Sequence, residues 1–246
     1  MDVPVLSSTN PSGWFVTLYP GAGEVGGSFR YSRPVKVWST GGDPARSREE
    51  AARRAGRMVR RYCAHNRLNR LGALTYRGTG CHDPLQLRRD VAEFFRRLRE
   101  LLGGDPLPYV WVPEWHKTNH GLHVHFAVGR FVPRGLVEQA WGRGFVHIKL
   151  LGDLPTGSTS RDEARVADRY LSKYVRKGFD ARRTPGLHRY EVAEGFQPAT
   201  VRLHGRSRED VLRQAAGLMG GEPAEVWTSQ QTLGWQGPPA LWAMWR

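Results

Sequence analysis

The sequence predicts an α+β protein in which an antiparallel sheet is followed by a helix that carries two tyrosines. Three observations predict this class. Short apolar runs alternate with two segments of helical periodicity between residues 71 and 151. Two of these runs are separated by only six residues, which is a length typical of an antiparallel hairpin or a short loop. A further helical pattern over residues 160–178 begins and ends with residues that favour helix termini.

The first elements of the sheet follow in order. Leu71–Tyr76 is predicted to be a buried strand. The next helix begins at Asp83 and Pro84, because Asp is a favoured N-cap and Pro is favoured at the first helical position. Its apolar residues recur at helical spacing, and Gly103 ends the run. These apolar positions are Leu87, Val91, Phe94, Phe95, Leu98, Leu101 and Leu102.

A hairpin, a short helix and a further strand complete the sheet. Strands are predicted over residues 109–115 and 122–128, joined by a turn that contains Gly121. A short helix near residues 133–141 and a strand over residues 145–151 come next. The order is therefore β-α-β-β-α-β, which is the pattern of a ferredoxin-like antiparallel sheet.

The last predicted helix of this region has two distinct sides. Ser160 to Glu163 has the pattern of a capping box that begins the helix, and Gly178 ends it. One side is an apolar stripe that would pack on the sheet, formed by Ala164, Ala167, Leu171 and Val175. The neighbouring side, about 100° wide, presents Tyr170, Lys173, Tyr174 and Lys177.

The two ends of the chain carry weaker signals. Residues 1–45 are expected to form an irregular N-terminal extension or hairpin, with β-like runs at residues 14–19 and 35–38. Residues 46–65 are predicted to be a helix rich in arginine, and its basic side suits either solvation or contact with phosphates. The expected division of the chain is 1–45, 46–180 and 181–246, the last segment having no assigned role.

The composition favours a polyanionic partner. The formal net charge is +14, and the basic residues are 32 Arg and five Lys against 23 acidic residues. The two cysteines, Cys63 and Cys81, form no CxxC motif, so a disulfide scaffold and a zinc ribbon are both unsupported. No signal peptide and no apolar run of about 18 residues is visible, so a cytoplasmic protein without a membrane span is expected.

Two histidines point to a metal site. Side chains alternate along a strand, so His123 and His125 project from the same face of the predicted strand 122–128. Glu114 lies near the end of the partner strand and can reach that face. Two imidazoles and one carboxylate leave positions open for water and a phosphate oxygen, as a catalytic Mg²⁺ or Mn²⁺ site requires. Three further histidines nearby leave the ligand set open: His116, His120 and His147.

The paired tyrosines suggest chemistry on a phosphodiester. A tyrosine nucleophile forms a covalent phosphotyrosine, which conserves bond energy for a later rejoining step. A metal ion would polarise the scissile phosphate, and a lysine nearby could stabilise developing charge. An ordinary amphipathic helix with two surface tyrosines is the alternative if the histidine pair is set aside.

Taken together, these blocks resemble the rolling-circle replication initiators of the HUH endonuclease superfamily, most closely the two-tyrosine type. The blocks that carry the resemblance are Leu71–Tyr76, Glu114 with His123-Val124-His125, and Tyr170-x-x-Lys173-Tyr174-x-x-Lys177. They stand in the family's order and cover roughly residues 62–180. The resemblance implies a metal-dependent nick in single-stranded DNA, a 5′-phosphotyrosine link and a free 3′-OH that primes synthesis.

The same resemblance implies a role for each matching residue. His123 and His125 would be metal ligands with Glu114 as the third, Tyr170 and Tyr174 would be nucleophiles, and Lys173 would assist them. Residues 46–180 would then be the catalytic domain. The chain has no Walker A motif, so a host helicase is the expected partner for strand separation. The expected phosphate contacts come from Arg53, Arg57, Arg60, Arg61 and Lys177.

Three other functions explain part of the pattern. A transposase or a relaxase would share the same site, although the compact size argues against a large relaxase. A non-catalytic single-stranded-DNA-binding module would explain the charge and the aromatic residues but not the Glu-His-His and tyrosine patterns. A metal-dependent hydrolase of small substrates would need neither the tyrosines nor the positive charge.

Overall fold

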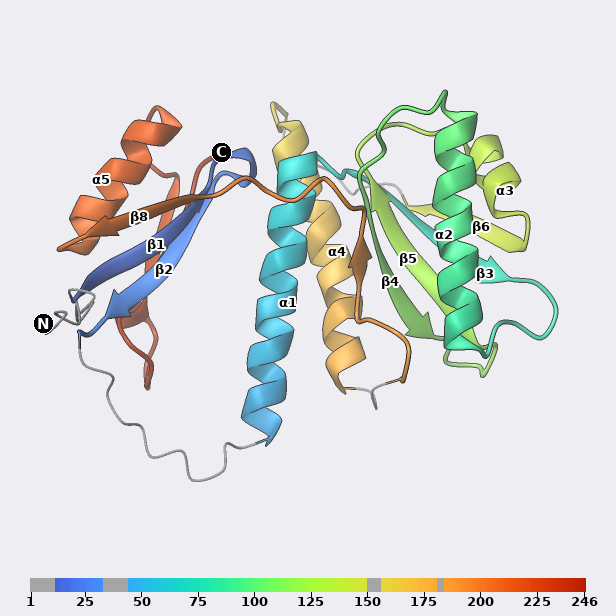
Figure 1. The fold of residues 1–246 in the computed structure, drawn as a ribbon, viewed down its shortest axis with the longest axis horizontal. Coiled ribbons are helices and arrows are strands. Elements are labelled where there is room, and N and C mark those ends of the chain that lie inside the picture. The colour runs from blue at the N-terminus through green and yellow to red at the C-terminus, as the bar shows by residue number, and fades with distance from the viewer. Residues whose placement is uncertain (1–11, 33–43, 150–155, 181–183) are drawn as a thin grey trace, which may run out of the picture. The chain divides into compact units, whose positions relative to one another are not determined.

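The computed structural model describes residues 12–32, 44–149, 156–180 and 184–246 (Figure 1). The chain divides into two compact units. The smaller unit combines Met1–Gly41 with Ala199–Arg246, and the larger unit is Gly42–Pro198. The larger unit contains the predicted tyrosine helix and histidine strand.

The larger unit is built on a five-stranded sheet in the order β6-β3-β5-β4-β7, with every pairing antiparallel. The first four of these strands and the helices between them follow the predicted order β-α-β-β-α-β, so the predicted α+β class is confirmed. Their bounds are β3 (Arg70–Tyr76), α2 (Pro84–Leu101), β4 (Tyr109–Trp115), β5 (Leu122–Val128), α3 (Arg134–Trp141) and β6 (Gly144–Lys149). β7 (Glu191–Val192) adds a short edge strand beside β4. The last two residues of the predicted strand 145–151 lie outside the described residues.

Two pairs of helices cover opposite faces of this sheet (Figure 1). α2 and α3 pack on one face around Phe94 and Trp141, both fully buried. α1 (Pro44–Asn66) and α4 (Ser160–Asp180) pack on the other face through Val59, Leu171 and Val175. The apolar stripe predicted for the tyrosine helix is therefore its contact with the sheet.

Alternation along β5 decides what each face receives. Leu122, Val124 and Phe126 are buried among the α2 and α3 side chains. His123 and His125 point to the opposite face, where α4 lies, because successive side chains of a strand project to opposite sides. The strand thus contributes to the core with one face and to a polar site with the other.

The helix termini agree with the predictions except in detail. Asp83 caps α2 by accepting a hydrogen bond of 2.9 Å from the amide of Leu85. The capping box predicted at Ser160 and Glu163 is wrong by one residue: Thr159 and Asp162 form it, with the Thr159 amide donating to Asp162 at 3.0 Å and the Asp162 amide donating to Thr159 Oγ1 at 3.3 Å. α4 continues to Asp180 rather than ending at Gly178. Gly178 is not among the glycines with positive φ, so it continues the helix.

The smaller unit joins the two ends of the chain in one sheet. Its order is β8-β1-β2-β10-β9, and α5 (Arg208–Met219) packs on one face. The strands are β1 (Gly13–Tyr19), β2 (Glu24–Arg30), β8 (Val201–Gly205), β9 (Glu225–Thr228) and β10 (Ala240–Met244). The described part of the N-terminal segment is thus a hairpin in a shared sheet, which differs from the expected division at residues 45 and 180. The β-like run at residues 35–38 lies outside the described residues.

Two negative observations apply to the described residues. None of their helices has an apolar stretch sufficient to cross a bilayer. Cys63 and Cys81 are both buried free thiols.

The turn between β4 and β5 supplies a test of stability. Gly121 has a φ of 75°, and a Cβ there would overlap the backbone of Cys81, with which Gly121 forms a β-bridge. Gly121→Ala is therefore expected to lower the free energy of unfolding by about 3 kcal/mol, measured by urea denaturation. Gly103→Ala is the matched control, because Gly103 has a φ of 87° but a Cβ there meets no atom within 4 Å. The control should lose only about 1 kcal/mol; equal losses would show that the contact with Cys81 contributes nothing.

Candidate metal and tyrosine site

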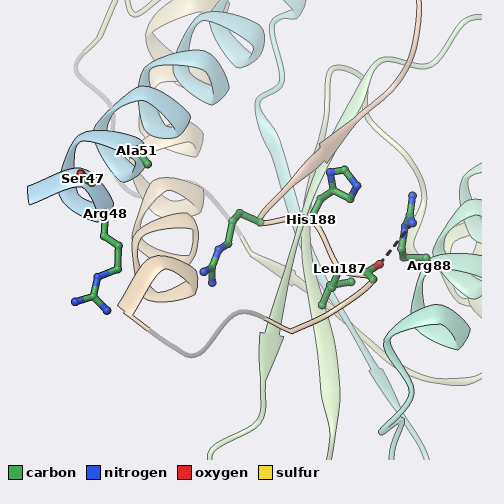
Figure 2. A pocket seen from close by; sticks show the side chains of 8 residues that line it. Ser47, Arg48, Ala51, Arg88, Leu187 and His188 are labelled. Atoms are coloured by element: carbon green, nitrogen blue, oxygen red, sulfur yellow. Dashed lines mark hydrogen bonds between the residues drawn. The ribbon is translucent and has the colours of Figure 1, made fainter. Parts of the chain in front are cut away.

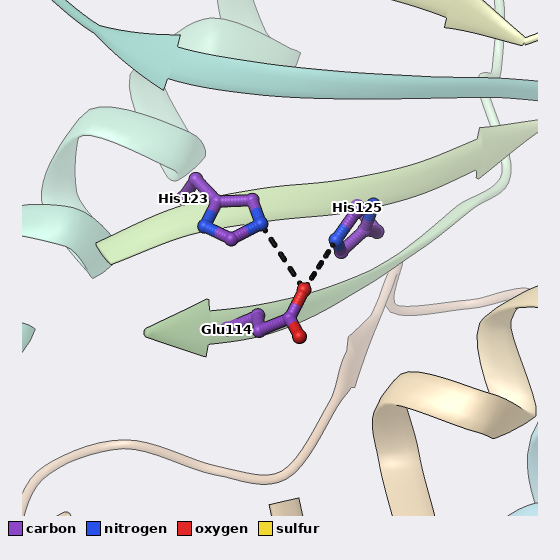
Figure 3. A group of neighbouring side chains, drawn as sticks. All are labelled: Glu114, His123 and His125. Atoms are coloured by element: carbon purple, nitrogen blue, oxygen red, sulfur yellow. Dashed lines mark hydrogen bonds and ion pairs between the residues drawn. The ribbon is translucent and has the colours of Figure 1, made fainter. Parts of the chain in front are cut away.

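A carboxylate and two imidazoles meet at one end of the β4–β5 hairpin (Figure 3). The strand register places Glu114 directly opposite His123. Glu114 Oε2 lies 3.1 Å from His123 Nε2 and 2.9 Å from His125 Nε2. The candidate ligand atoms of the three residues all lie within 4.8 Å of one another. The predicted group of ligands is thus brought together.

Burial sets the protonation of this group. It lowers the pKa of His123 below its usual value and that of His125 to about 4, so both imidazoles are neutral at pH 7 and can donate a lone pair. Burial acts to raise the pKa of Glu114, but hydrogen bonds from Lys177 and His125 outweigh it and the net shift is downward. The site at pH 7 therefore holds one carboxylate and two neutral imidazoles.

These donors fit a divalent cation. Adjacent ligands of an octahedral ion with bonds of about 2.1 Å lie about 3.0 Å apart. The two nitrogen–oxygen distances at Glu114 match that spacing. A mixed set of imidazole and carboxylate suits Mn²⁺ or Mg²⁺ more than a thiolate-seeking ion. The structure supports the presence of a metal site and leaves the choice of ion open.

The two tyrosines of α4 lie directly over this group. The Tyr174 ring stacks on the His125 ring, with centroids 3.6 Å apart and planes inclined by 18°. The Tyr170 ring meets His125 edge-on at 5.9 Å. The two hydroxyls are 3.1 Å apart, within hydrogen-bond distance. The helix thus brings both predicted nucleophiles to the candidate metal ligands, as one turn of spacing requires.

Stacking has a structural consequence for His125. The buried Nδ1 atoms of His123 and His125 have no hydrogen-bond partner among the described residues. A metal-binding histidine is usually oriented by a hydrogen bond at its second nitrogen. At His125 the flat contact with Tyr174 restricts the ring in its place, so the nucleophile helix also positions a metal ligand.

Three lysines surround the tyrosines, and each has a different position. Lys177 donates a hydrogen bond of 2.7 Å to Glu114 Oε1 and lies 5.0 Å from the centre of the Tyr174 ring. Lys173 is exposed and lies 5.9 Å from the same ring. Lys149 of β6 lies 4.9 Å from the Tyr170 ring.

Sequence reasoning missed Lys149 and placed Lys177 only among the DNA contacts. The signal for Lys149 was present, because it alternates with Val146 and Ile148, which contact the α2 and α3 cluster, and so faces α4. Burial raises the pKa of Tyr170 to about 12, with the Tyr174 hydroxyl contributing and Lys149 opposing the shift. The neighbouring cations therefore matter for any reaction of this phenol.

The other histidines lie outside the group of three. His120 is hydrogen-bonded to the carbonyl oxygen of Tyr76 at 2.9 Å, and His116 to Thr118 Oγ1 at 2.6 Å. His147 faces the same side as His125 but is separated from it by Ala73 of β3. The ligand set that the sequence left open is thereby narrowed to three residues.

The arginines predicted to contact DNA divide by exposure. Arg53 and Arg57 are exposed and Arg60 is half-buried, and at about 100° per residue they lie on the side of α1 opposite its packed stripe. Arg61 is only 9% exposed, so it is poorly placed for the predicted phosphate contact. Nothing in the geometry connects Arg53, Arg57 and Arg60 with the tyrosines, and their contact with DNA stays a prediction.

A small groove opens beside the tyrosines. It has a volume of about 180 Å³ and is bounded by Glu114, Tyr174 and Lys177 on one side. Leu187, His188 and Arg189 form the other side. A chain entering this groove would pass directly along the candidate metal ligands and one of the phenols.

Comparison with known proteins identifies the segment that carries the site. Residues 69–179 match the family model of the replication-associated proteins of ORF2 type. This segment therefore belongs to a family of rolling-circle replication initiators, which confirms the resemblance to such initiators deduced from its motifs. It contains the Glu-His-His group, both tyrosines, and Lys149, Lys173 and Lys177. No curated protein and no solved structure matches the chain.

Removal of the carboxylate tests the metal site. Glu114→Gln keeps the shape of the side chain but removes its charge, so the affinity for Mn²⁺ measured by calorimetry is expected to fall at least about tenfold. Glu138→Gln is the control, because Glu138 pairs with Arg134 on α3, away from the metal ligands. Unchanged Mn²⁺ affinity in Glu114→Gln would contradict the assignment of Glu114 as a ligand.

The stacking contact has its own test. Tyr174→Phe keeps an aromatic ring on His125, whereas Tyr174→Leu does not. We expect Mn²⁺ affinity to be unchanged in the first variant and to fall about three- to tenfold in the second, because His125 loses its orientation. If both variants bind Mn²⁺ like the unaltered protein, the stack does not position the ligand.

Proposed function

We propose that this chain is a rolling-circle replication initiator of plasmid or phage type that nicks and rejoins single-stranded origin DNA through a 5′-phosphotyrosine intermediate. The family of residues 69–179 supports the role in replication. The observation that carries the chemistry is the contact between the two tyrosines of α4 and the Glu114, His123 and His125 group. A phenol beside a site for a divalent cation is what a metal-dependent transesterification needs.

The proposed reaction exchanges one phosphodiester for another. A tyrosine Oη forms a bond to the phosphorus, and the bond from phosphorus to the 3′ oxygen breaks. The phenol loses its proton and the departing 3′ oxygen gains one, so the products are a 5′-phosphotyrosine and a free 3′-OH. A bound Mg²⁺ or Mn²⁺ would supply a Lewis acid that polarises the scissile phosphate.

The residues of this chain divide the remaining work. Glu114, His123 and His125 would hold the cation, and Lys177 keeps the carboxylate of Glu114 oriented through its hydrogen bond. Lys149 and Lys173 supply positive charge beside the phenols, where the departing proton leaves negative charge. Together with Lys177, these lysines would stabilise the pentavalent transition state.

Two nucleophiles would allow initiation and termination at one site. The hydroxyls are 3.1 Å apart, so the same phosphate position is within reach of either after a small shift. One tyrosine could hold the 5′ end of the displaced strand while the other attacks the regenerated origin. Arg53, Arg57 and Arg60 would contribute phosphate contacts and a host helicase would separate the strands.

Tyrosine substitution tests the covalent intermediate. With an origin-derived single strand and Mn²⁺, Tyr170→Phe and Tyr174→Phe are each expected to retain some protein–oligonucleotide adduct on a denaturing gel. The double variant should bind the strand normally and form no adduct, because no phenol remains beside the metal ligands. Chelator should abolish the adduct in the unaltered protein and added Mn²⁺ should restore it.

Tyr190→Phe is the matched control, since Tyr190 packs against the same apolar cluster as the two tyrosines but is not part of the Glu-His-His group. If one single variant alone eliminates every adduct and the other behaves as unaltered, the enzyme uses one tyrosine. If the double variant still forms an adduct, the tyrosine assignment is overturned. Binding without an adduct in every form, with metal present, would instead indicate a non-catalytic DNA-binding module.

A further inference from the structure

A basic recess lies beyond the small groove, on the side away from the metal ligands. It has a volume of about 570 Å³, and Figure 2 shows its lining side chains. The first turns of α1 contribute Ser47, Arg48 and Ala51, and α2 contributes Arg88. The remaining wall is the segment from Gly186 to Arg189.

Positive charge dominates this recess. Three guanidinium groups line it, from Arg48, Arg88 and Arg189, and no acidic side chain is among the described residues of its wall. Arg88 is held from outside the wall, because its Nε pairs with Glu191 at 2.8 Å and its Nη1 donates to the carbonyl oxygen of Gly186 at 3.5 Å. Its guanidinium is therefore already oriented before a ligand arrives. A wall with three arginines and no acid is suited to an anion.

The recess adjoins the catalytic groove. Leu187, His188 and Arg189 line both cavities, so this short segment borders each of them. The groove on the other side of that segment contains Glu114 and Tyr174. A single extended chain could therefore pass from the tyrosines across residues 187–189 into the recess.

We propose that this recess binds the phosphates of the single-stranded DNA that flanks the nicked phosphate, with Arg48, Arg88 and Arg189 as the contacts. This inference rests on the proposed function, because it takes single-stranded DNA as the substrate. Guanidinium groups pair with phosphates through forked hydrogen bonds, so three of them in one recess suit successive phosphates of a strand. Phosphate contacts position the strand without reading its sequence.

The location of the recess makes it a property of this chain rather than of the matched family segment. Residues 47–51 and 186–189 lie outside residues 69–179. Only Arg88 lies within them. The catalytic residues and the flanking-strand contacts would therefore come from different parts of the sequence, and each can be altered alone.

Arg48 is also distinct from the other arginines of α1. At about 100° per residue it lies on the same side of the helix as Ala55, Val59 and Tyr62, which pack against the sheet and α4. Arg54 is exposed on the same helix but does not line the recess. The pair provides a matched comparison of two exposed arginines, one facing the recess and one not.

The test measures binding of oligothymidylates of about 6 and about 24 nucleotides to the full chain, by fluorescence anisotropy over a range of salt concentrations. Arg48→Ala is expected to weaken binding of the long strand about tenfold and to change binding of the short strand little. The slope of log affinity against log salt for the long strand should fall in magnitude by about 0.7, because one phosphate contact is lost. Arg54→Ala should match the unaltered protein in both measurements.

Two further variants separate charge from folding. Arg48→Lys keeps the positive charge and should retain the salt slope, while Arg189→Ala removes a contact from the opposite wall and should reduce it like Arg48→Ala. Equal behaviour of Arg48→Ala and Arg54→Ala at both lengths would overturn the proposal. Loss of short-strand binding together with long-strand binding would also overturn it, since the defect would then lie at the catalytic groove.

The outcome is independent of the tyrosine chemistry. A length-dependent loss in Arg48→Ala, combined with no adduct in any form of the protein, would support the recess as a DNA site and reject the covalent mechanism. Adduct formation with no length-dependent loss would do the reverse.

Discussion

The pairing of β4 with β5 holds Glu114 opposite His123, and the chemistry of the site depends on this register. The six residues between the strands form a tight turn in which the His116 amide donates to the Gly121 carbonyl at 2.8 Å. A slip of one residue would move every side chain of β5 to the opposite face. The imidazoles would then enter the apolar cluster of α2 and α3, and Val124 and Phe126 would face the tyrosines. Burial of Phe126 and Val124 thus fixes the metal ligands as surely as it fixes the core.

α4 depends on the same sheet for its position. Ala167, Leu171 and Val175 are fully buried against the sheet and α1, which fixes the rotation of the helix. Tyr170, Tyr174 and Lys177 lie beside that stripe, so the rotation that buries the apolar residues also places the phenols over His125. The ion pair of Lys177 with Glu114 then ties the C-terminal part of the helix to β4. Packing and chemistry are set by neighbouring sides of one helix, and the stack of Tyr174 on His125 joins them.

Local patterns made most of this unit predictable. The strands, α2 and the tyrosine helix carry their own periodicity and capping residues, and Glu114, His123 and His125 are joined by a short hairpin whose register follows from its length. Pairings between distant segments carry no such signal. Trp14 of β1 lies opposite Gly205 of β8, and nothing local to either strand indicates the other, so the shared sheet of the smaller unit was not foreseen. The capping box moved by one residue because Thr159 and Ser160 are both good caps, and only geometry chooses between them.

Arginine content was a weaker guide than arginine position. The helix α1 is basic along much of its length, and composition alone cannot say which of its arginines faces a ligand. Its packed stripe, through Val59 and Tyr62, places Arg48 at the recess and Arg53 on the other side of the helix, where Arg53 pairs with Glu49 at 2.5 Å. An exposed pair of this kind stabilises the helix little and leaves the charge solvated. Phosphate binding gains more where several guanidinium groups converge and one is already held in place, as Arg88 is by Glu191. Convergence of charge, rather than its amount, therefore distinguishes the recess from the rest of this basic surface.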